Sequence, residues 1–386
     1  MKVLILATDI YTRGGIARYS YTFASALADL LGPDNVHLLP LLGHGHPSDL
    51  HPRFRVLAPV SERLTTTAKV WFAMRTLALA RNRYDLIVCT HVNLARVAAA
   101  VHFLYKTPFW VVCHGIEAWR PLSWLRRAAL RQSSLLLPIS RFTCEKLCEV
   151  HKIPRQRTSI LYNTIPHHLE KLLTAPAATA SSEESLGARE NLVLSVGSLT
   201  EPHAYKGFDT VIRALPTVLK QLPNVKYVIV GEGEDQPRLE RLREEYQLGS
   251  HVTFAGSVSD EELARYYRAC DVFVLPSRVT TRNGCLQGEG FGRVYVEAAL
   301  AGKPVVGSRG VGAAEAVLDG QTGILIDPTS VEQTAGAIIE LLANPAAAAQ
   351  MGLNGRRWAA EKFTEDALRK SLAGLLRANG WREFRA

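Results

Sequence analysis

The chain has 386 residues, more than a single hydrophobic core usually supports, so we expect two domains. Its hydrophobic fraction of 47% and charged fraction of 21% are typical of globular proteins, and they exclude a disordered, collagen-like or disulfide-stapled chain. No apolar run approaches the roughly 18 residues of a membrane-spanning helix, which argues against a transmembrane protein.

The formal charge of +9 is distributed unevenly along the chain. Residues 1–190 contain 23 Lys and Arg against 13 Asp and Glu, whereas residues 191–386 contain 22 against 23. We therefore expect the first half to face something anionic, such as nucleic acid, a membrane surface or a phosphorylated substrate. The six cysteines are scattered without zinc-ligand spacing, which indicates reduced thiols in the cytoplasm.

In the first half, short apolar runs alternate with helical patterns. The run Val3-Leu4-Ile5-Leu6 predicts a strand buried on both faces of a parallel sheet, and this fits better than a secretory signal. A helix is predicted from about residue 16 to Leu31. Further strands are predicted at 86–88, 109–112 and 135–137, and helices at 92–105, 122–132 and 140–151. This alternation is typical of βαβ units.

Residues 171–190 predict an interdomain connection, because they lack aromatic residues and are rich in Ala, Ser, Thr and Glu. Strands are then predicted at 192–196, 227–230, 252–254, 272–275 and 305–306, with helices at 208–222, 236–247, 260–269 and 293–301. Successive helices follow from 330, and the last, 363–386, is expected to cross back to the first domain. We expect two doubly wound domains, 1–170 and 191–362, with the active site in a cleft at the carboxyl ends of their strands.

Two features of the first half suggest a ligand. Gly14 and Gly15 precede a predicted helix, where backbone N–H groups and the helix dipole favour an anion. A tight turn explains the pair equally well, and no G-x-G-x-x-G dinucleotide fingerprint is present. His114 follows a predicted strand and can point into a cleft, although histidines in cores and on surfaces are more common.

The strongest motif is GEGFGRVYVEA at 288–298. On one helix its two glutamates would be separated by about 12 Å of rise, but the intervening glycines break the helix. We therefore expect Glu289 in a loop, accepting hydrogen bonds from sugar hydroxyls, and Glu297 in the next helix, holding ribose hydroxyls. Apolar neighbours argue against Glu297 as an ordinary surface charge. Lys206 suits a diphosphate leaving group, although most lysines are simply solvated.

The stretch GEGFGRVYVEAALAGKPVVG resembles the E-x7-E signature of retaining nucleotide-sugar glycosyltransferases of family 4. Other similar stretches occur in the expected order: GGIARYS, HGIE at 114–117, YKGFD at 205–209, YVIVGEGED, VTFAGSVSDEEL and ACDVFVLPS. The resemblance covers residues 1 to about 328 and is looser through 40–105. It implies the α/β GT-B fold, with a cleft between two Rossmann-like domains.

The resemblance also implies site residues. His114, Lys206 and Glu289 would be catalytic, contacting the donor sugar or its diphosphate. Donor binding would involve Gly14, Gly15, Ser198, Lys206, Ser257, Val258, Glu289, Gly290, Phe291, Gly292 and Glu297. The family usually has arginine where this chain has Ser198, so we expect Arg278 or Arg282 to supply that charge at the diphosphate.

The activity implied is transfer of a hexose from a UDP- or GDP-sugar to a hydroxyl acceptor, which we expect to be a lipid-linked or oligosaccharide intermediate of cell-surface polysaccharide synthesis. The relevant loops carry no D-x-D motif, so we expect no metal ion and no other cofactor. Two alternatives stay open, a nucleotide-sugar epimerase on the same fold and a non-catalytic, membrane-associated sugar-binding protein.

Two segments of the first half are basic and contain no acidic residue. Five basic residues lie in segment 63–83 and four in segment 119–131, and each segment also contains two aromatic residues. They fit basic amphipathic helices on an anionic membrane, or equally helices with a solvated basic face and a buried aromatic stripe. Nucleic-acid binding is not expected, because no nucleic-acid motif accompanies the charge. We expect a cytoplasmic protein, which on the first of these two interpretations would be peripheral at the inner face of the membrane.

Overall fold

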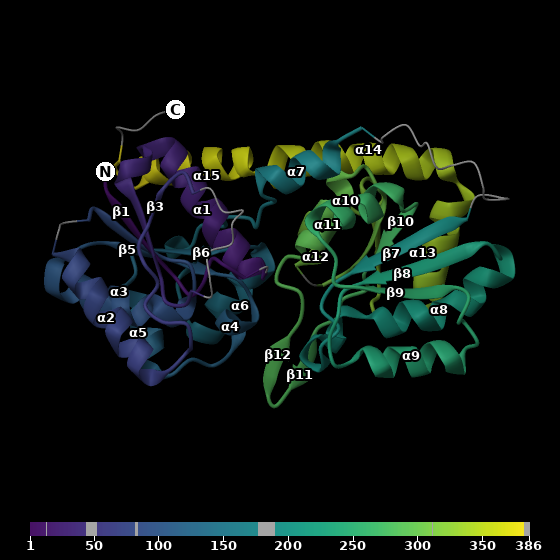
Figure 1. Cartoon of the computed structure of the whole chain (residues 1–386), viewed down its shortest axis with the longest axis horizontal. Coiled ribbons are helices and arrows are strands. Elements are labelled where there is room, and N and C mark those ends of the chain that lie inside the picture. The colour runs from purple at the N-terminus through teal and green to yellow at the C-terminus, as the bar shows by residue number, and fades with distance from the viewer. Residues whose placement is uncertain (13, 44–51, 82–83, 177–189, 311, 382–386) are drawn as a thin grey trace. The chain divides into compact units, whose positions relative to one another are not determined.

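The computed structural model describes residues 1–12, 14–43, 52–81, 84–176, 190–310 and 312–381. The chain forms two compact units (Figure 1). The first unit comprises Met1–Pro166 together with Glu365–Ala386, and the second comprises His167–Thr364.

The first unit is built on a six-stranded parallel sheet with the order β3-β2-β1-β4-β5-β6. Its strands are β1 (Val3–Ala7), β2 (Val36–Pro40), β3 (Arg55–Val56), β4 (Leu86–Cys89), β5 (Phe109–Cys113) and β6 (Leu135–Pro138). Its helices are α1 (Gly15–Leu31), η1 (Pro33–Asn35), α2 (Thr66–Ala80), η2 (Val92–Leu94), α3 (Ala95–Tyr105), α4 (Ile116–Trp119), α5 (Trp124–Gln132), α6 (Arg141–His151), η3 (Arg155–Arg157) and α15 (Glu365–Ala378). This strand order is that of a doubly wound, Rossmann-like sheet.

Burial explains why the strands of this sheet are continuous apolar runs. All five residues of β1 are buried, and β1 pairs in parallel with β2 and β4, placing Val3 opposite both Val36 and Leu86. A strand covered by helices on both faces must be apolar on both faces. The last helix, α15, packs against α1 and so belongs to this unit.

The second unit repeats the same plan, with the strand order β14-β13-β10-β7-β8-β9. Its strands are β7 (Asn191–Val196), β8 (Val225–Val230), β9 (Val252–Gly256), β10 (Val272–Val274), β11 (Thr280–Arg282), β12 (Cys285–Gln287), β13 (Val305–Ser308) and β14 (Gly323–Ile326). Its helices are α7 (His167–Thr174), η4 (Glu201–Lys206), α8 (Phe208–Gln221), α9 (Gln236–Glu245), α10 (Asp260–Ala269), α11 (Arg293–Leu300), α12 (Ala313–Ala316), α13 (Val331–Ala343) and α14 (Pro345–Lys362). Counted within the unit, this is again the Rossmann-like order.

The predicted strands and helices are present with small shifts at their ends, except that the last helix, expected over 363–386, ends at Ala378. Residues 382–386 lie outside the described residues. The long loop expected before Glu289 contains an antiparallel hairpin, β11-β12, joined by Asn283 and Gly284, which both have positive φ. Asn-Gly is the preferred two-residue hairpin turn, so the sequence did hold this signal. Residues 171–174, expected in the interdomain connection, form the end of α7, and residues 177–189 lie outside the described residues.

The described residues form neither a membrane-spanning helix nor a disulfide. No helix among them has the length and apolar character needed to cross a bilayer. All six cysteines are free thiols, four of them buried.

Candidate active site

The loops that leave β7, β8 and β10 approach one another so closely that only glycine fits at the contacts. Gly231, after β8, has a φ of +140°, and a Cβ there would lie 1.9 Å from the carbonyl oxygen of Gly197, after β7. Gly207 has a φ of +82°, and a Cβ there would lie 2.2 Å from the carbonyl oxygen of Pro276, after β10. These positive φ angles and short approaches require glycine. They bring the three loops together at the carboxyl edge of the sheet.

Lys206 and Glu289 meet at this edge. Lys206 ends η4, Glu289 lies between β12 and α11, and the Lys206 Nζ donates to the Glu289 Oε2 at 2.9 Å. Their side chains are 12% and 17% exposed, so the ion pair is largely shielded from water. The stem of Lys206 lies against Gly197, where a Cβ would be 2.9 Å from the Lys206 Cδ. The structure thus brings together two of the three predicted catalytic residues.

Glycines also shape the loop that carries Glu289. The backbone N–H of Gly312 donates to the carbonyl oxygen of Glu289 at 3.2 Å, and a Cβ on Gly312 would lie 2.2 Å from the oxygen of Gly290. Gly292, with a φ of +79°, immediately precedes α11. The predicted break is therefore confirmed, with Glu289 in a loop and Glu297 in the helix.

Glu297 is held from two sides and is only 4% exposed. Its Oε1 accepts a hydrogen bond from the Arg293 Nη2 at 3.1 Å, and its Oε2 accepts one from the Tyr267 hydroxyl at 2.8 Å. Burial, together with the charge of Glu297, holds the pKa of Tyr267 well above its usual value, so this hydroxyl stays a donor. Glu297 is therefore a fixed, buried carboxylate and not an ordinary surface charge.

The two arginines expected at the diphosphate have acidic partners in this structure. The Arg278 Nη2 lies 3.1 Å from the Asp209 Oδ2, and the Arg282 Nη2 lies 3.1 Å from the Glu201 Oε2. The Ser198 Oγ donates to a neighbouring threonine hydroxyl, Thr200 Oγ1, at 3.4 Å. The charge of each arginine is thus already balanced by a carboxylate.

His203 interacts electrostatically with Lys206 and Glu289, although no motif in the sequence indicated it as a site residue. Its Nδ1 lies 2.9 Å from the Thr200 Oγ1, and its ring packs edge-on against Tyr205, with centroids 5.7 Å apart. Burial lowers the pKa of His203, as does the Lys206 ammonium, while Glu289 acts in the opposite direction. The only signal in the sequence was its position three residues before Lys206.

The remaining predicted donor-binding residues follow other strands. In the first unit, Gly14 caps α1, and a Cβ on Gly15 would have no heavy atom within 4 Å. In the second unit, Ser257 and Val258 follow β9, with Ser257 exposed and Val258 half-buried. No group of three or more His, Cys, Asp or Glu among the described residues is arranged to hold a metal ion.

His114, also in the first unit, is 7% exposed and follows β5. Its Nε2 donates to the carbonyl oxygen of Thr90 at 2.8 Å, which leaves Nδ1 as the acceptor of a neutral ring. The backbone N–H groups of His114 and Gly115 donate to the Glu117 Oε1 at 2.6 and 3.2 Å. Burial lowers the pKa of His114 while Glu117 opposes the shift. A neutral His114 can accept a hydrogen bond from a hydroxyl through Nδ1.

We predict that the first unit loses stability as the pH falls from about 7 toward 4. Burial lowers the pKa of His91 to about 4, and the pKa of His114 is lowered too. The unfolded chain, with a histidine pKa of about 6.5, binds more protons in this window, so acidification favours unfolding. His91→Asn removes the ring but keeps an acceptor for the Asn93 N–H.

Thermal melts at a series of pH values measure this effect. The melting temperature of His91→Asn should fall less on acidification than that of the wild type. NMR titration of the imidazole signals provides an independent check. If the two melting curves shift equally, or if His91 titrates near 6.5, the protonation states given above are wrong.

Comparison with known sequences gives matches along most of the chain. The family model described as "Glycosyltransferase Family 4" matches residues 13–169, and the model described as "Glycosyl transferases group 1" matches residues 178–358. The chain is 34% identical over 298 residues to the GDP-mannose-dependent alpha-(1-6)-phosphatidylinositol monomannoside mannosyltransferase of Mycolicibacterium smegmatis. That alignment covers 76% of this chain and 74% of the relative.

Solved structures with low sequence identity have the same fold. The Anabaena protein Alr3699/HepE, in complex with UDP, matches with a TM-score of 0.79 at 21% identity, covering 98% of this chain and 100% of that chain. Sucrose-phosphate synthase from Thermosynechococcus elongatus matches with a TM-score of 0.77 at 24% identity, covering 98% and 99%. The expected GT-B fold is therefore confirmed.

Proposed function

Because this chain belongs to glycosyltransferase family 4, it is a retaining hexosyltransferase that uses a nucleotide-sugar donor, and we propose that it transfers mannose from GDP-mannose to a lipid-linked acceptor. The choice of donor and acceptor follows relatives whose names specify GDP-mannose and phosphatidylinositol mannosides. The comparisons favour sugar transfer over both the epimerase and the non-catalytic alternative.

The Lys206–Glu289 pair is the observation that carries this proposal. In the transfer reaction, negative charge develops on the departing diphosphate while the sugar carbon becomes positively charged. The Lys206 ammonium, held 2.9 Å from the Glu289 Oε2, would move its hydrogen bonds to the diphosphate oxygens when the donor binds. Glu289 would then accept hydrogen bonds from the sugar hydroxyls.

We propose a front-face substitution through an oxocarbenium-like transition state, in which the departing diphosphate takes the proton of the acceptor hydroxyl. The protein would contribute mainly positioning and charge stabilisation. Glu297 would bind the ribose hydroxyls, with its carboxylate oriented by Arg293 and Tyr267. His114 would accept a hydrogen bond from a donor-sugar hydroxyl through Nδ1. Since Lys206 would provide the charge at the diphosphate, no metal ion would be required.

We predict that Glu289→Gln lowers kcat by about two to three orders of magnitude, because it removes the charge that orients Lys206 and the sugar. Transfer of mannose is measured by mass spectrometry of the glycolipid product, in buffer containing excess chelator. Glu245→Gln, at an exposed position in α9, is the matched control and should retain the wild-type rate. Near-normal turnover by Glu289→Gln would refute its assignment, and loss of wild-type activity in chelator would refute metal independence.

The donor can be identified without an acceptor. We predict that GDP and GDP-mannose raise the melting temperature more than UDP and UDP-glucose at equal concentration. A ligand present at 100 times its Kd stabilises the folded state by about 2.7 kcal/mol, which is readily detected as a shift of a few degrees. A larger shift with the uridine compounds would overturn the choice of GDP-mannose while leaving the family unchanged.

One surface of the first unit favours a membrane-bound acceptor. Helices α2, α3 and α5 pack in sequence, α2 on α3 and α3 on α5 (Figure 1). Trp71, Phe103 and Trp124 on these helices are 60%, 73% and 75% exposed. None of the three helices contains Asp or Glu, and together they carry Lys69, Arg75, Arg96, Arg126, Arg127 and Arg131.

We propose that this surface, the basic aromatic face, rests on an anionic membrane. Exposed aromatic side chains among basic residues are typical of protein segments at the bilayer interface. We predict that Trp71→Ala weakens binding to phosphatidylglycerol vesicles by about tenfold, since an exposed indole loses its lipid contact.

Vesicle binding is measured by cosedimentation. Leu104→Ala and Leu353→Ala form a matched pair for this assay. The two leucines are 56% and 48% exposed, but Leu104 is at the end of α3 and Leu353 is in the second unit. Only Leu104→Ala should weaken vesicle binding. If the wild type does not bind anionic vesicles, or if the two variants behave alike, this face does not contact the membrane.

A further inference from the structure

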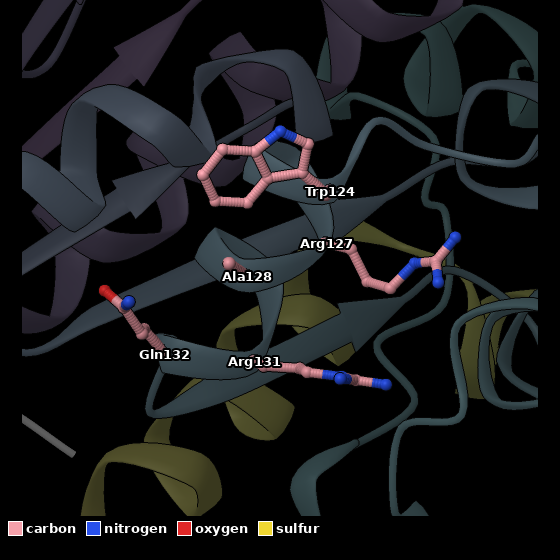
Figure 2. A pocket seen from close by; sticks show the side chains of 5 residues that line it. All are labelled: Trp124, Arg127, Ala128, Arg131 and Gln132. Atoms are coloured by element: carbon pink, nitrogen blue, oxygen red, sulfur yellow. The ribbon is translucent and has the colours of Figure 1, made fainter.

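Helix α5 carries a pocket to which the proposed reaction assigns no role. The pocket has a volume of about 470 Å³ and is lined by Trp124, Arg127, Ala128, Arg131 and Gln132 (Figure 2). These positions follow Trp124 by three, four, seven and eight residues, so they share one face of the helix. The small side chain of Ala128 lies between Trp124 and Gln132 and leaves space there.

Two guanidinium groups give the pocket its positive charge. Figure 2 shows the side chains of Arg127 and Arg131 extending in the same direction from α5. The Arg131 Nη2 donates to the carbonyl oxygen of His151 at 3.1 Å, which orients the group without neutralising it. The buried Nε of Arg127 has no hydrogen-bond partner, and within the described part of the chain neither arginine forms a salt bridge.

Two neighbouring groups, His151 and Arg157, add no negative charge to the pocket. Burial lowers the pKa of His151, and Arg127 and Arg131 act in the same direction, so the ring is neutral at pH 7. Arg157 donates hydrogen bonds to the carbonyl oxygens of Arg131 and Ser133, at the C-terminal end of α5. A third guanidinium thus satisfies the helix-end carbonyls, whose partial negative charge would otherwise oppose an anion.

We propose that this pocket binds a phosphate group, and that this group belongs to the headgroup of an anionic phospholipid. Two arginines four residues apart can each offer paired N–H donors to phosphate oxygens. The exposed Trp124 ring, which lines the same pocket, is suited to the level of the lipid headgroups. This inference rests on the proposed membrane contact and assigns the recognition of headgroups to α5.

The test compares two kinds of vesicle with equal negative surface charge. In one the charge comes from phosphatidic acid, and in the other from oleate, which offers a carboxylate in place of a phosphate. We expect the wild type to prefer phosphatidic acid vesicles. We expect Arg127→Gln/Arg131→Gln to bind these vesicles about tenfold more weakly than the wild type and to bind oleate vesicles almost as well.

Arg126→Gln is the matched control for Arg127→Gln. Arg126 is the preceding residue of α5 and does not line the pocket, and it helps to lower the pKa of His91. The two substitutions therefore remove the same charge at positions about 100° apart around the helix. If Arg131→Gln fails to fold because the bond to His151 is lost, Arg131→Lys keeps the charge and loses only the paired donors. It should then bind phosphatidic acid vesicles with intermediate affinity.

The outcomes separate this inference from the membrane proposal. If the wild type binds both vesicles equally, and Arg126→Gln and Arg127→Gln weaken binding alike, the membrane contact stands and the phosphate pocket is refuted. If the wild type binds neither vesicle, the membrane contact fails and the lipid headgroup fails with it. A change in tryptophan fluorescence on adding inorganic phosphate, absent in Trp124→Phe, would in that case assign the pocket to a soluble phosphorylated compound.

Discussion

The close approach of backbones at the carboxyl edge of the second sheet is the constraint on which the candidate site depends. All strands of that sheet are parallel, so the loops that follow them begin at the same edge. Where these loops come closest, larger side chains would collide with the neighbouring loop. Glycines at 197, 207 and 231 remove those side chains. As a result Lys206 and Glu289, 83 residues apart in sequence, lie at hydrogen-bond distance.

The charges at this edge are paired before any donor binds. Lys206 neutralises the partly exposed Glu289, and Arg293 neutralises the buried Glu297, so neither carboxylate is left without a counter-charge. Arg278, one of the two arginines expected at the diphosphate, forms a salt bridge with Asp209 at the start of α8. Serine replaces the usual family arginine at position 198. In the proposed reaction, the diphosphate would therefore be bound mainly by Lys206, which would exchange its hydrogen bond to Glu289 for bonds to the diphosphate oxygens.

The excess positive charge of the chain lies in the first unit, where two basic segments also carry aromatic residues. In each of the two basic segments the aromatic residues divide between core and surface. Phe72 and Trp119 are buried, whereas Trp71 and Trp124 are exposed. One aromatic residue of each segment is thus part of the core, Phe72 in α2 and Trp119 at the end of α4, whereas the other lies on the surface. The buried residues account for helix packing, and the exposed ones are those on which the proposed membrane contact depends.

The sequence by itself predicted four of the six strands of the first sheet, five of the six of the second, and the separation of Glu289 from Glu297, because these follow from local periodicity and from glycine's conformational freedom. It also contained the one-turn spacing between Arg293 and Glu297. Only the tertiary structure decided that Tyr267 holds Glu297 and that Lys206 pairs with Glu289. Such pairs join segments distant in sequence, and their meeting depends on strand order, register and loop packing, which no local pattern encodes.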